Sequence, residues 1–375
     1  MNFSVERKEF VKTISKFLGI AEKSTTQPIL SAILVSTDGL SKVRLFGTNL
    51  EISLSDSAPA DVSAEGKIAI DCRKIYEIIK ELPDGKVNLA LQENRSVLIK
   101  AGKSKFTLQT YAPEEFPTPP GLESELQFEI QSEAFLDMVK KTAFAVGEQD
   151  TRYVLNGLLT YFKKTEQAAS IRMVGTDGHR LAISAGVVNC LSNGSCQEKK
   201  MVIPKKAVME IKKLVSETDL ETIHLSTGKT QVTVTIGETR FSARMLEGSY
   251  PEYAKIIPEK FSKNVTFRKE EIEQAIRRVS ILSNKEVKGV KLSVDQEKAS
   301  LSAASAESGT AEDEISLLYQ GEKFETGFNS RYLLDAFGAV EHEEIVMNIN
   351  EPISPAAFKN PKDPNSLWIV MPMRI

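Results

Sequence analysis

FSVERKEFVKTI, at residues 3–14, is the first of three stretches that share one pattern. The other two are FEIQSEAFLDMV at residues 128–139 and VTFRKEEIEQAI at residues 265–276. Each has apolar residues at relative positions 0, 2, 7 and 11. A spacing of two places side chains on one face of a strand, and a spacing of four places them on one face of a helix. Each stretch therefore predicts a short strand that leads into an amphipathic helix.

Two further patterns follow each stretch in the same order. The first predicts a second helix, with Asp71 or Asn329 as the N-cap and Pro204 near the first turn. The second predicts a closing strand, after segments that alternate apolar and polar residues, around Phe106, Phe241 and Trp368. Three patterns that recur three times in the same order indicate a triplicated unit.

The repeats predict an α+β fold of three domains, each with two helices and an antiparallel sheet. Proline-rich segments at residues 113–120 and 251–262 suggest the boundaries. We expect domains at residues 1–124, 125–256 and 257–375. The six helices are expected at residues 6–18, 71–82, 132–144, 204–215, 269–281 and 329–340.

Composition fits a soluble globular chain, with 41% hydrophobic and 26% charged residues among 375. No apolar run approaches the ~18 residues of a membrane helix, so no membrane association is expected. The N-terminus lacks the apolar stretch of a signal peptide, so export is not expected. Cys72, Cys190 and Cys196 form no paired framework, which suits a reducing cytoplasm.

The net charge of −3 argues against general nucleic-acid binding, so any role on DNA depends on where the charge lies. Residues 6–18 carry +2 and residues 204–215 carry +3, whereas the other four expected helices are neutral. The helices therefore sum to +5, and the rest of the chain carries −3 − 5 = −8. A mildly basic helical layer suits a polyanion, although Lys and Arg also commonly solvate helix faces.

Four strings resemble the bacterial sliding clamp family, the beta subunits of DNA polymerase III. They are QDTRYVLNG at residues 149–157, GTDGHRL at 175–181, ILSN at 281–284 and MPMRI at 371–375. The similarity runs in order from Phe3 to Ile375. It implies three DNA-clamp domains per chain and a head-to-tail homodimer, a six-domain ring with helices inside and sheets outside.

The resemblance also implies a function without catalysis or cofactor. Such a ring encircles double-stranded DNA without reading its sequence, and it tethers the alpha subunit of the replicative polymerase. Other polymerases and repair proteins would bind through a short linear motif, and an ATP-driven clamp loader would place the ring on DNA. The implied location is the cytoplasm, in association with the nucleoid.

Carried over by motif, the resemblance places three sites on this sequence. The partner-peptide pocket would comprise Leu155, Thr176, Gly178, His179, Arg180, Leu181, Pro251, Lys255, Ile256, Asn329, Tyr332, Ile353, Pro355, Ile369, Met371, Pro372, Met373 and Arg374. DNA-binding residues would be Gln149, Arg152 and Tyr153, with Lys23, Arg73, Lys205, Lys206 and Lys285 as compatible basic positions. The dimer interface would join Lys74, Phe106 and Leu108 to Ile281 and Leu282, near acidic residues 312–314. Relatives often have tyrosine at Val154 and arginine near Ser24, which leaves the individual DNA contacts open.

Other interpretations of the same residues remain open at this point. Asp177 and His179 could form the orienting and basic groups of a hydrolase, although no nucleophile motif accompanies them. Residues 227–230, TGKT, resemble the end of a phosphate-binding loop, but Ile223 stands where the first glycine is needed. The Met-Pro-Met terminus could simply be a buried final strand, and Phe106 and Leu108 could alternate within a core strand. A scaffold that never surrounds DNA is a third possibility.

Overall fold

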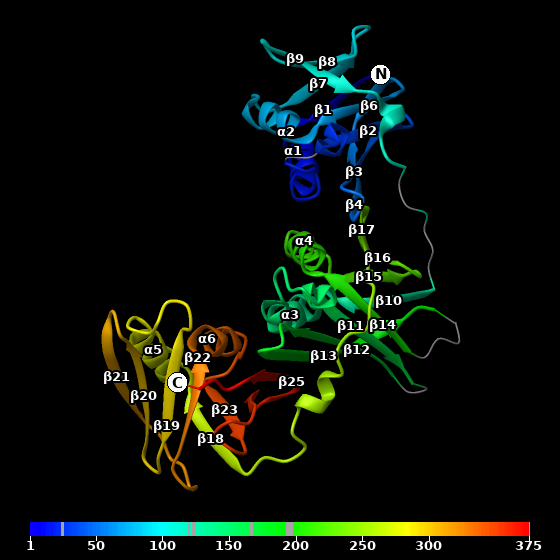
Figure 1. The fold of residues 1–375 in the computed structure, drawn as a ribbon. Helices are drawn as coiled ribbons and strands as arrows, with labels where there is room; N and C mark the ends of the chain where they lie inside the picture. Colours follow the sequence, from blue (N-terminus) through cyan, green and yellow to red (C-terminus); the bar gives the residue numbers. More distant parts are fainter. Residues whose placement is uncertain (24–25, 119–120, 122–124, 166–167, 193–197, 375) are drawn as a thin grey trace. The chain divides into compact units, whose positions relative to one another are not determined.

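The computed structural model describes residues 1–23, 26–118, 121, 125–165, 168–192 and 198–374 (Figure 1). Ser24 and Cys196, and the expected boundary at residue 124, lie outside the described residues. The chain divides into two compact units. The first unit contains residues 1–132, 189–195 and 209–245, and the second contains residues 133–188, 196–208 and 246–375.

The first unit contains the elements of the first repeat and four strands of the second repeat. The first repeat consists of β1 (Asn2–Glu6), α1 (Arg7–Ser15), β2 (Ala32–Asp38), β3 (Lys42–Thr48), β4 (Ile52–Pro59), β5 (Asp61–Ala64), β6 (Lys67–Asp71), α2 (Cys72–Glu81), β7 (Lys86–Leu91), β8 (Ser96–Ala101) and β9 (Ser104–Tyr111). The strands of the second repeat in this unit are β10 (Leu126–Gln131), β15 (Thr222–Thr227), β16 (Gln231–Ile236) and β17 (Thr239–Arg244). Eight of the described strands form an antiparallel sheet in the order β6-β2-β3-β4-β17-β16-β15-β10.

The second unit repeats this plan. It holds α3 (Ser132–Thr142), β11 (Gly157–Lys164), β12 (Ala169–Thr176), β13 (Arg180–Cys190), β14 (Glu198–Pro204), β18 (Lys263–Arg268), α5 (Lys269–Ser280), β19 (Gly289–Val294), β20 (Lys298–Ser305), β21 (Gly309–Ser316), β22 (Phe324–Asn329), α6 (Ser330–Gly338), β23 (Glu344–Ile349), β24 (Ala356–Asn360) and β25 (Asp363–Val370). The ends of α3 and β13 and most of α4 (Lys205–Ser216) belong to the first unit. Eight described strands form the order β14-β11-β12-β13-β25-β24-β23-β18.

Each unit also has a shorter run of four paired strands. In the first unit the order is β9-β8-β7-β1, and in the second it is β21-β20-β19-β22. Residues 104–109 of β9 pair with β8 alone, and β21 pairs with β20 alone, among the described strands. Both strands therefore present an open edge.

The expected fold class is confirmed. The six helices of the described chain match the six expected ranges within a few residues, and 3-10 turns (Lys16–Gly19 and Ala143–Ala145) continue α1 and α3. The predicted caps also form, because Asp71 accepts a bond from Lys74 N at 2.9 Å and Asn329 accepts one from Arg331 N at 2.9 Å. Pro204 ends β14 directly before α4. The extra strand β5, which pairs with β1, was not predicted.

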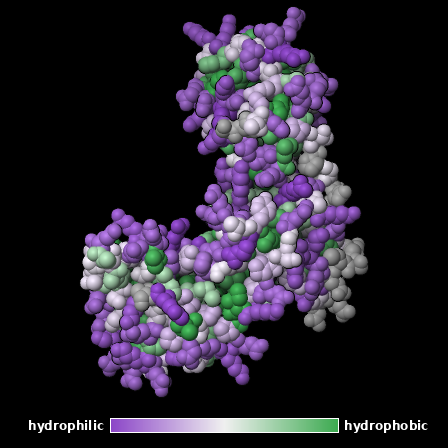
Figure 2. Space-filling model, viewed as in Figure 1, coloured by the Kyte–Doolittle hydropathy of each residue, from purple (hydrophilic) through white to green (hydrophobic). Residues whose placement is uncertain are grey.

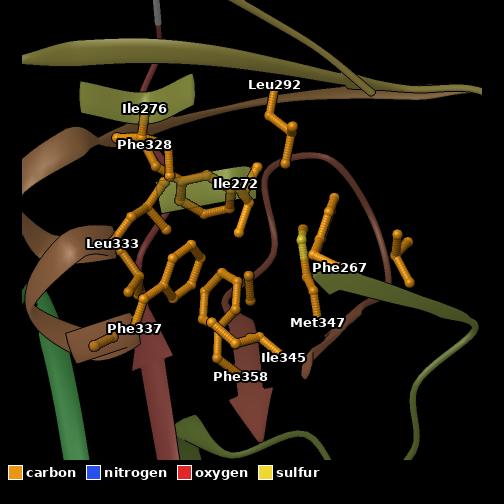
Figure 3. Packing of buried hydrophobic residues seen from close by; sticks show 14 of the residues in the cluster. Phe267, Ile272, Ile276, Leu292, Phe328, Leu333, Phe337, Ile345, Met347 and Phe358 are labelled. Carbon is orange, nitrogen blue, oxygen red and sulfur yellow. The ribbon is translucent and has the colours of Figure 1, made fainter. Parts of the chain in front are cut away.

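The apolar positions that define the repeats form the cores. In the third repeat, Ile272 and Ile276 of α5 pack with Phe267, Leu333 and Met347 (Figure 3). Phe358 meets Phe328 and Phe337 edge-on, with ring centroids 6.2 and 5.1 Å apart. Burying one such side chain contributes about 1.5–3 kcal/mol, so this cluster is a main source of stability in the third repeat.

The surface is mainly hydrophilic on the face drawn in Figure 2, where apolar side chains show in small separate areas. None of the described helices is long and apolar enough to cross a membrane.

Candidate functional site

The GTDGHRL string forms a tight turn between β12 and β13. Thr176 Oγ1 donates to Arg180 O at 2.6 Å, and Asp177 Oδ1 accepts from the backbone N–H groups of His179 and Arg180 at 2.9 and 3.1 Å. Gly178 has φ +86°, and a Cβ there would lie 2.8 Å from Arg152 Nη2. The left-handed backbone favours glycine at this position, and the Arg152 guanidinium approaches it closely.

Arg180 is the centre of the candidate pocket. Its guanidinium donates to Asp177 Oδ2 at 2.9 Å, Asp335 Oδ2 at 2.5 Å and Phe144 O at 2.8 Å. It also lies over the rings of Tyr332 and Phe144, at 4.5 and 5.5 Å from their centroids. Five contacts on one largely buried cation fix it rigidly, so it can serve as a wall of a binding site.

His179 lies at the rim of the same cluster. Its ring stacks on that of Tyr332, with 6.3 Å between centroids and 19° between planes. Both carboxylate oxygens of Asp177 are bonded to Arg180 or to backbone N–H groups. Asp177 therefore orients the turn and Arg180, and the described contacts give it no role in orienting the His179 ring as a base.

The C-terminal strand β25 joins the cluster through β13. Leu181 pairs with Ile369 and Arg180 with Val370, and Met371 N donates to His179 O at 2.9 Å. Trp368, Ile369 and Val370 are buried, but Met371 is 37% exposed. Both interpretations of the terminus therefore hold in part, since a buried final strand delivers Met371 to the surface beside the turn. Pro372 and Met373 are half-buried, Met373 N donates to Gly327 O at 2.8 Å, and Arg374 is exposed.

An apolar cluster lies beneath this surface. Leu181 and Ile369 are buried in it, and Tyr250 and Tyr253 pack against it from the segment before β18. Tyr250 donates its hydroxyl to Val174 O at 3.2 Å, and burial raises the pKa of Tyr250 well above its ordinary value. Apolar side chains with a few fixed polar groups are the usual lining of a ligand-binding site.

The remaining predicted pocket residues occupy three kinds of position. Thr176 and Leu155 are buried, and Asn329 caps α6, which carries Tyr332. Pro251, Lys255, Ile256 and Ile353 are exposed, and Pro355 is half-buried. The structure thus brings Gly178, His179, Arg180, Tyr332 and Met371 together, whereas the exposed residues lie on the flanking segments. Sequence reasoning missed Phe144 and Asp335, although Asp335 is three residues after Tyr332 and so lies on the same helix face.

The predicted DNA-binding residues of the second repeat lie in one exposed segment. Gln149 has φ +56°, Tyr153 is 60% exposed, and Arg152 binds Asp150 at 2.8 Å and Asp177 O at 3.0 Å. Hydrogen bonds from the side chain and backbone N–H of Arg152 lower the pKa of Asp150 to about 2. Arg152 is therefore partly neutralised and connects this segment to the GTDGHRL turn.

The other basic candidates are mixed in character. Lys205 pairs with Glu148 at 2.7 Å, and Arg73 donates to Leu18 O at 3.1 Å from a half-buried position. Lys23, Lys206 and Lys285 are exposed. Lys205 and Arg73 thus have internal roles as well as their charge.

Four of the predicted dimer residues lie on or beside the two open edges, since Phe106 and Leu108 belong to β9, and Ile281 and Leu282 follow α5, which packs on β21. Phe106 on β9 is 41% exposed and Ile281 after α5 is 78% exposed, while Leu108 and Leu282 are half-buried and Lys74 is exposed. The alternative that Phe106 belongs to a core strand is therefore wrong.

Comparisons with known proteins match the whole chain. Family models for the N-terminal, central and C-terminal domains of the DNA polymerase III beta subunit match residues 1–120, 129–252 and 254–374. The beta sliding clamp of Pseudomonas aeruginosa is 31% identical and that of Caulobacter vibrioides 30%, each over 100% of both chains.

Solved structures agree with these matches. The DNA polymerase III beta subunit of Pseudomonas aeruginosa superposes with a TM-score of 0.94 at 30% identity, and a sliding clamp from Bartonella birtlesii bound to griselimycin with 0.94 at 29%. Both cover 100% of each chain. The family is a non-catalytic processivity factor, so the hydrolase interpretation of Asp177 and His179 is wrong. The chain belongs to the beta sliding clamp family, the beta subunits of DNA polymerase III.

Proposed function

We propose that two copies of this chain close head to tail into a ring around duplex DNA, and that the ring holds the replicative polymerase on its template. The observation that carries the proposal is the pair of incomplete sheets. Each unit contains one eight-stranded sheet and one run of four strands with an open edge. Pairing β21 of one copy with β9 of the next would complete a third eight-stranded sheet on the same plan.

The two complete sheets predict the register of that pairing. Leu54 of β4 faces Phe241, and Ala182 of β13 faces Trp368. On the hairpins, Leu54 faces Gly47, Ala182 faces Gly175 and, at the same place in the third repeat, Ala311 faces Ala303. Because Phe106 corresponds to Phe241 and Trp368, Ala311 would face Phe106 of the partner subunit.

This register also pairs opposite charges. One residue along from Ala311, Glu312 would face Lys105 of the partner subunit. Ile281, Leu282 and Leu108 would supply the apolar centre of the seam. An apolar centre with complementary charges at the rim is the usual composition of a protein interface.

Weak, non-specific attraction suits a ring that slides. The six helical ranges expected from the sequence carry a combined charge of +5, and the basic candidates Lys23, Lys206 and Lys285 are exposed. Phosphate contacts of this kind position a duplex without reading its bases. Retention on DNA would then come from closure of the ring, and Gln149, Arg152 and Tyr153 would add individual contacts.

Partner proteins would bind at the surface formed by His179, Arg180, Tyr332 and Met371. A short peptide with aliphatic or aromatic anchors fits the apolar cluster around Leu181 and Ile369, and flexible methionines suit several partners. Such partners would include the polymerase alpha subunit, other polymerases, repair proteins and an ATP-driven loader. We propose domains at residues 1–124, 125–256 and 257–375, and a cytoplasmic location with the nucleoid.

A nicked circular plasmid tests ring closure. The chain, loaded with a clamp loader and ATP, should stay on the circle through gel filtration and should leave after the circle is cut once. A scaffold that binds the DNA surface would be insensitive to cutting, and that result would contradict the proposal.

A further inference from the structure

The two complete sheets cross from one repeat to the next in the same way. Where β4 meets β17 and where β13 meets β25, each pair of facing residues in one sheet has a counterpart in the other. The facing pairs are Leu54 with Phe241, Ser53 with Ser242 and Ile52 with Ala243, against Ala182 with Trp368, Leu181 with Ile369 and Arg180 with Val370. The surface proposed above to bind partner peptides therefore has a counterpart at β4 and β17.

The turn before β4 repeats the GTDGHRL turn bond for bond. Thr48 Oγ1 donates to Ile52 O at 2.9 Å, as Thr176 Oγ1 does to Arg180 O. Asn49 Oδ1 accepts from the N–H groups of Glu51 and Ile52 at 3.1 and 2.8 Å, as Asp177 Oδ1 does at its turn. Leu50 has φ +76° where Gly178 has +86°. Arg244 N donates to Glu51 O at 2.8 Å, as Met371 N does to His179 O at 2.9 Å.

The segment that follows each repeat also takes the same course. Phe116 packs on Phe46 of β3, with ring centroids 5.9 Å apart, and Tyr250 binds Val174 of β12, the position that corresponds to Phe46. Pro117 follows Phe116 as Pro251 follows Tyr250. Pro117 lines a cavity of about 390 Å³ together with Thr48, Leu50, Ser53, Ser242 and Arg244.

The side chains at this cavity differ in chemistry from those of the other surface. Ser53 and Ser242 stand where Leu181 and Ile369 stand in the second unit. Ser242 Oγ is 2.9 Å from Thr233 Oγ. Ser53 is only 6% exposed and lines the cavity. A hydroxyl in a cavity wall, where a ligand can reach it, favours a ligand that hydrogen-bonds to it.

We propose that this cavity, the Ser53 groove, is a second peptide-docking site, which takes an extended peptide with a neutral polar side chain, such as threonine, over Ser53. The inference rests on the proposed peptide site at Met371, because it transfers that role through the repeated backbone. The peptide's aliphatic residues would contact Leu50 at the rim, where a left-handed backbone presents the exposed side chain. An aliphatic anchor would leave the Ser53 hydroxyl unpaired and so bind roughly 10-fold or more weakly.

Two fluorescein-labelled hexapeptides test the proposal. Both consist of alanine except at positions three and five, which carry threonine in one peptide and leucine in the other, because alternate side chains of an extended peptide share a face. Anisotropy titrations would measure affinity and stoichiometry on the full chain. The threonine peptide should bind at one per chain, lose about tenfold in affinity in Ser53→Ala, and bind normally after removal of residues 371–375.

The second test replaces Ser53 and Ser242 with the residues at the corresponding positions of the second unit. The double variant Ser53→Leu/Ser242→Ile should bind two leucine peptides per chain where the unaltered chain binds one. If Ser53→Ala leaves threonine-peptide binding unchanged and the double variant, folded by circular dichroism, still binds a single leucine peptide, the Ser53 groove is not a docking site. If the unaltered chain binds no leucine peptide, the proposed site at Met371 fails, while the threonine peptide still decides the Ser53 groove.

Discussion

Strands β13 and β25 pair across two repeats, which we call a closed crossing, whereas β21 has an open edge. A cation lies at the same position of the repeat in both places. At the closed crossing, Lys141 binds Asp137 at 2.6 Å and Asp363 at 2.9 Å, and its side chain is 10% exposed. Near the open edge, Arg278 binds Asp313 at 2.5 Å but is 56% exposed. The cation at this position is thus shielded from water where two strands pair across the repeats, and exposed beside a strand with an open edge.

The closed crossing at β4 and β17 agrees with this comparison. Lys16 takes the corresponding position, binds the nearly buried Asp56 at 2.7 Å and donates to Thr239 at 3.0 Å. Asp56 and Asp313 occupy corresponding positions on β4 and β21, which supports the proposal that β21 acquires a partner strand in the same way.

The largest expected effect is on dimer formation, and it follows from a change that prevents the β9 and β21 edges of two chains from pairing. Changing Ile281 and Leu282 together to Asp should abolish dimers, because two charges would enter the apolar centre of the seam. Sedimentation should give the mass of one chain, and the circular dichroism spectrum should be retained. A dimer of unaltered mass would refute the proposed seam.

A smaller but still large effect is expected from removing the shielded cation. Lys141→Met should destabilise the chain by about 3–5 kcal/mol, because two partly buried carboxylates lose their partner. Arg278→Met is the matched control, and its exposed pair should contribute only about 0–1 kcal/mol to a monomeric chain. Urea unfolding of both variants in the Ile281→Asp/Leu282→Asp background would measure the difference. Equal losses would mean that the two environments do not differ as the structure indicates.

Acid should weaken the closed crossing to a lesser degree. Burial acts to raise the pKa of Asp363, but hydrogen bonds from Lys141, Ser366 and Asn365 N lower it below the ordinary 3.8 overall. Because the folded pKa is the lower one, this group stabilises the fold above about pH 4, and the contribution is lost as pH falls from there through the folded pKa. Urea midpoints between pH 7 and pH 3 should therefore fall less steeply in Asp363→Asn. An identical pH slope in both proteins would contradict this role.

The smallest effect on the fold is expected at the terminus. Deletion of residues 371–375, of which Ile375 lies outside the described residues, should weaken the leucine peptide at least tenfold, since Met371 contacts the turn at His179. Dimer mass should stay the same and the urea midpoint should fall only slightly, because the buried strand ends at Val370 and the deletion removes the backbone bonds of Met371 and Met373. A monomeric or unfolded product would show that the terminus belongs to the core.

The repeats were readable from the sequence because local periodicity alone determines them. Apolar spacing located all six helices of the described chain, and Asp71 and Asn329 were recognised as caps from their position before the apolar pattern. The cluster around Arg180 was only partly predictable. Its members Phe144, Asp177, Asp335 and Tyr332 come from four separate segments, and only tertiary packing brings them together.

The correspondence between the Ser53 groove and the surface at Met371 could not be predicted from the sequence, for a different reason. TNLEI at residues 48–52 and TDGHR at residues 176–180 share one identical residue, threonine, and the bonds that equate them join Thr and Asn or Asp side chains to backbone groups. Leu50 at a left-handed position gives no signal in sequence, because glycine or asparagine is the usual residue there.

The charges on the two open edges also determine which assemblies cannot form. Residues 103 and 105, at the tip and start of β9, are lysines, whereas residues 312–314 of β21 are all acidic. Two β9 strands laid side by side would bring like charges together, and so would two β21 strands. Pairing of like edges, and the fibril growth that could follow from it, are thereby disfavoured. The charges thus favour contact between a β9 edge and a β21 edge over contact between two identical edges.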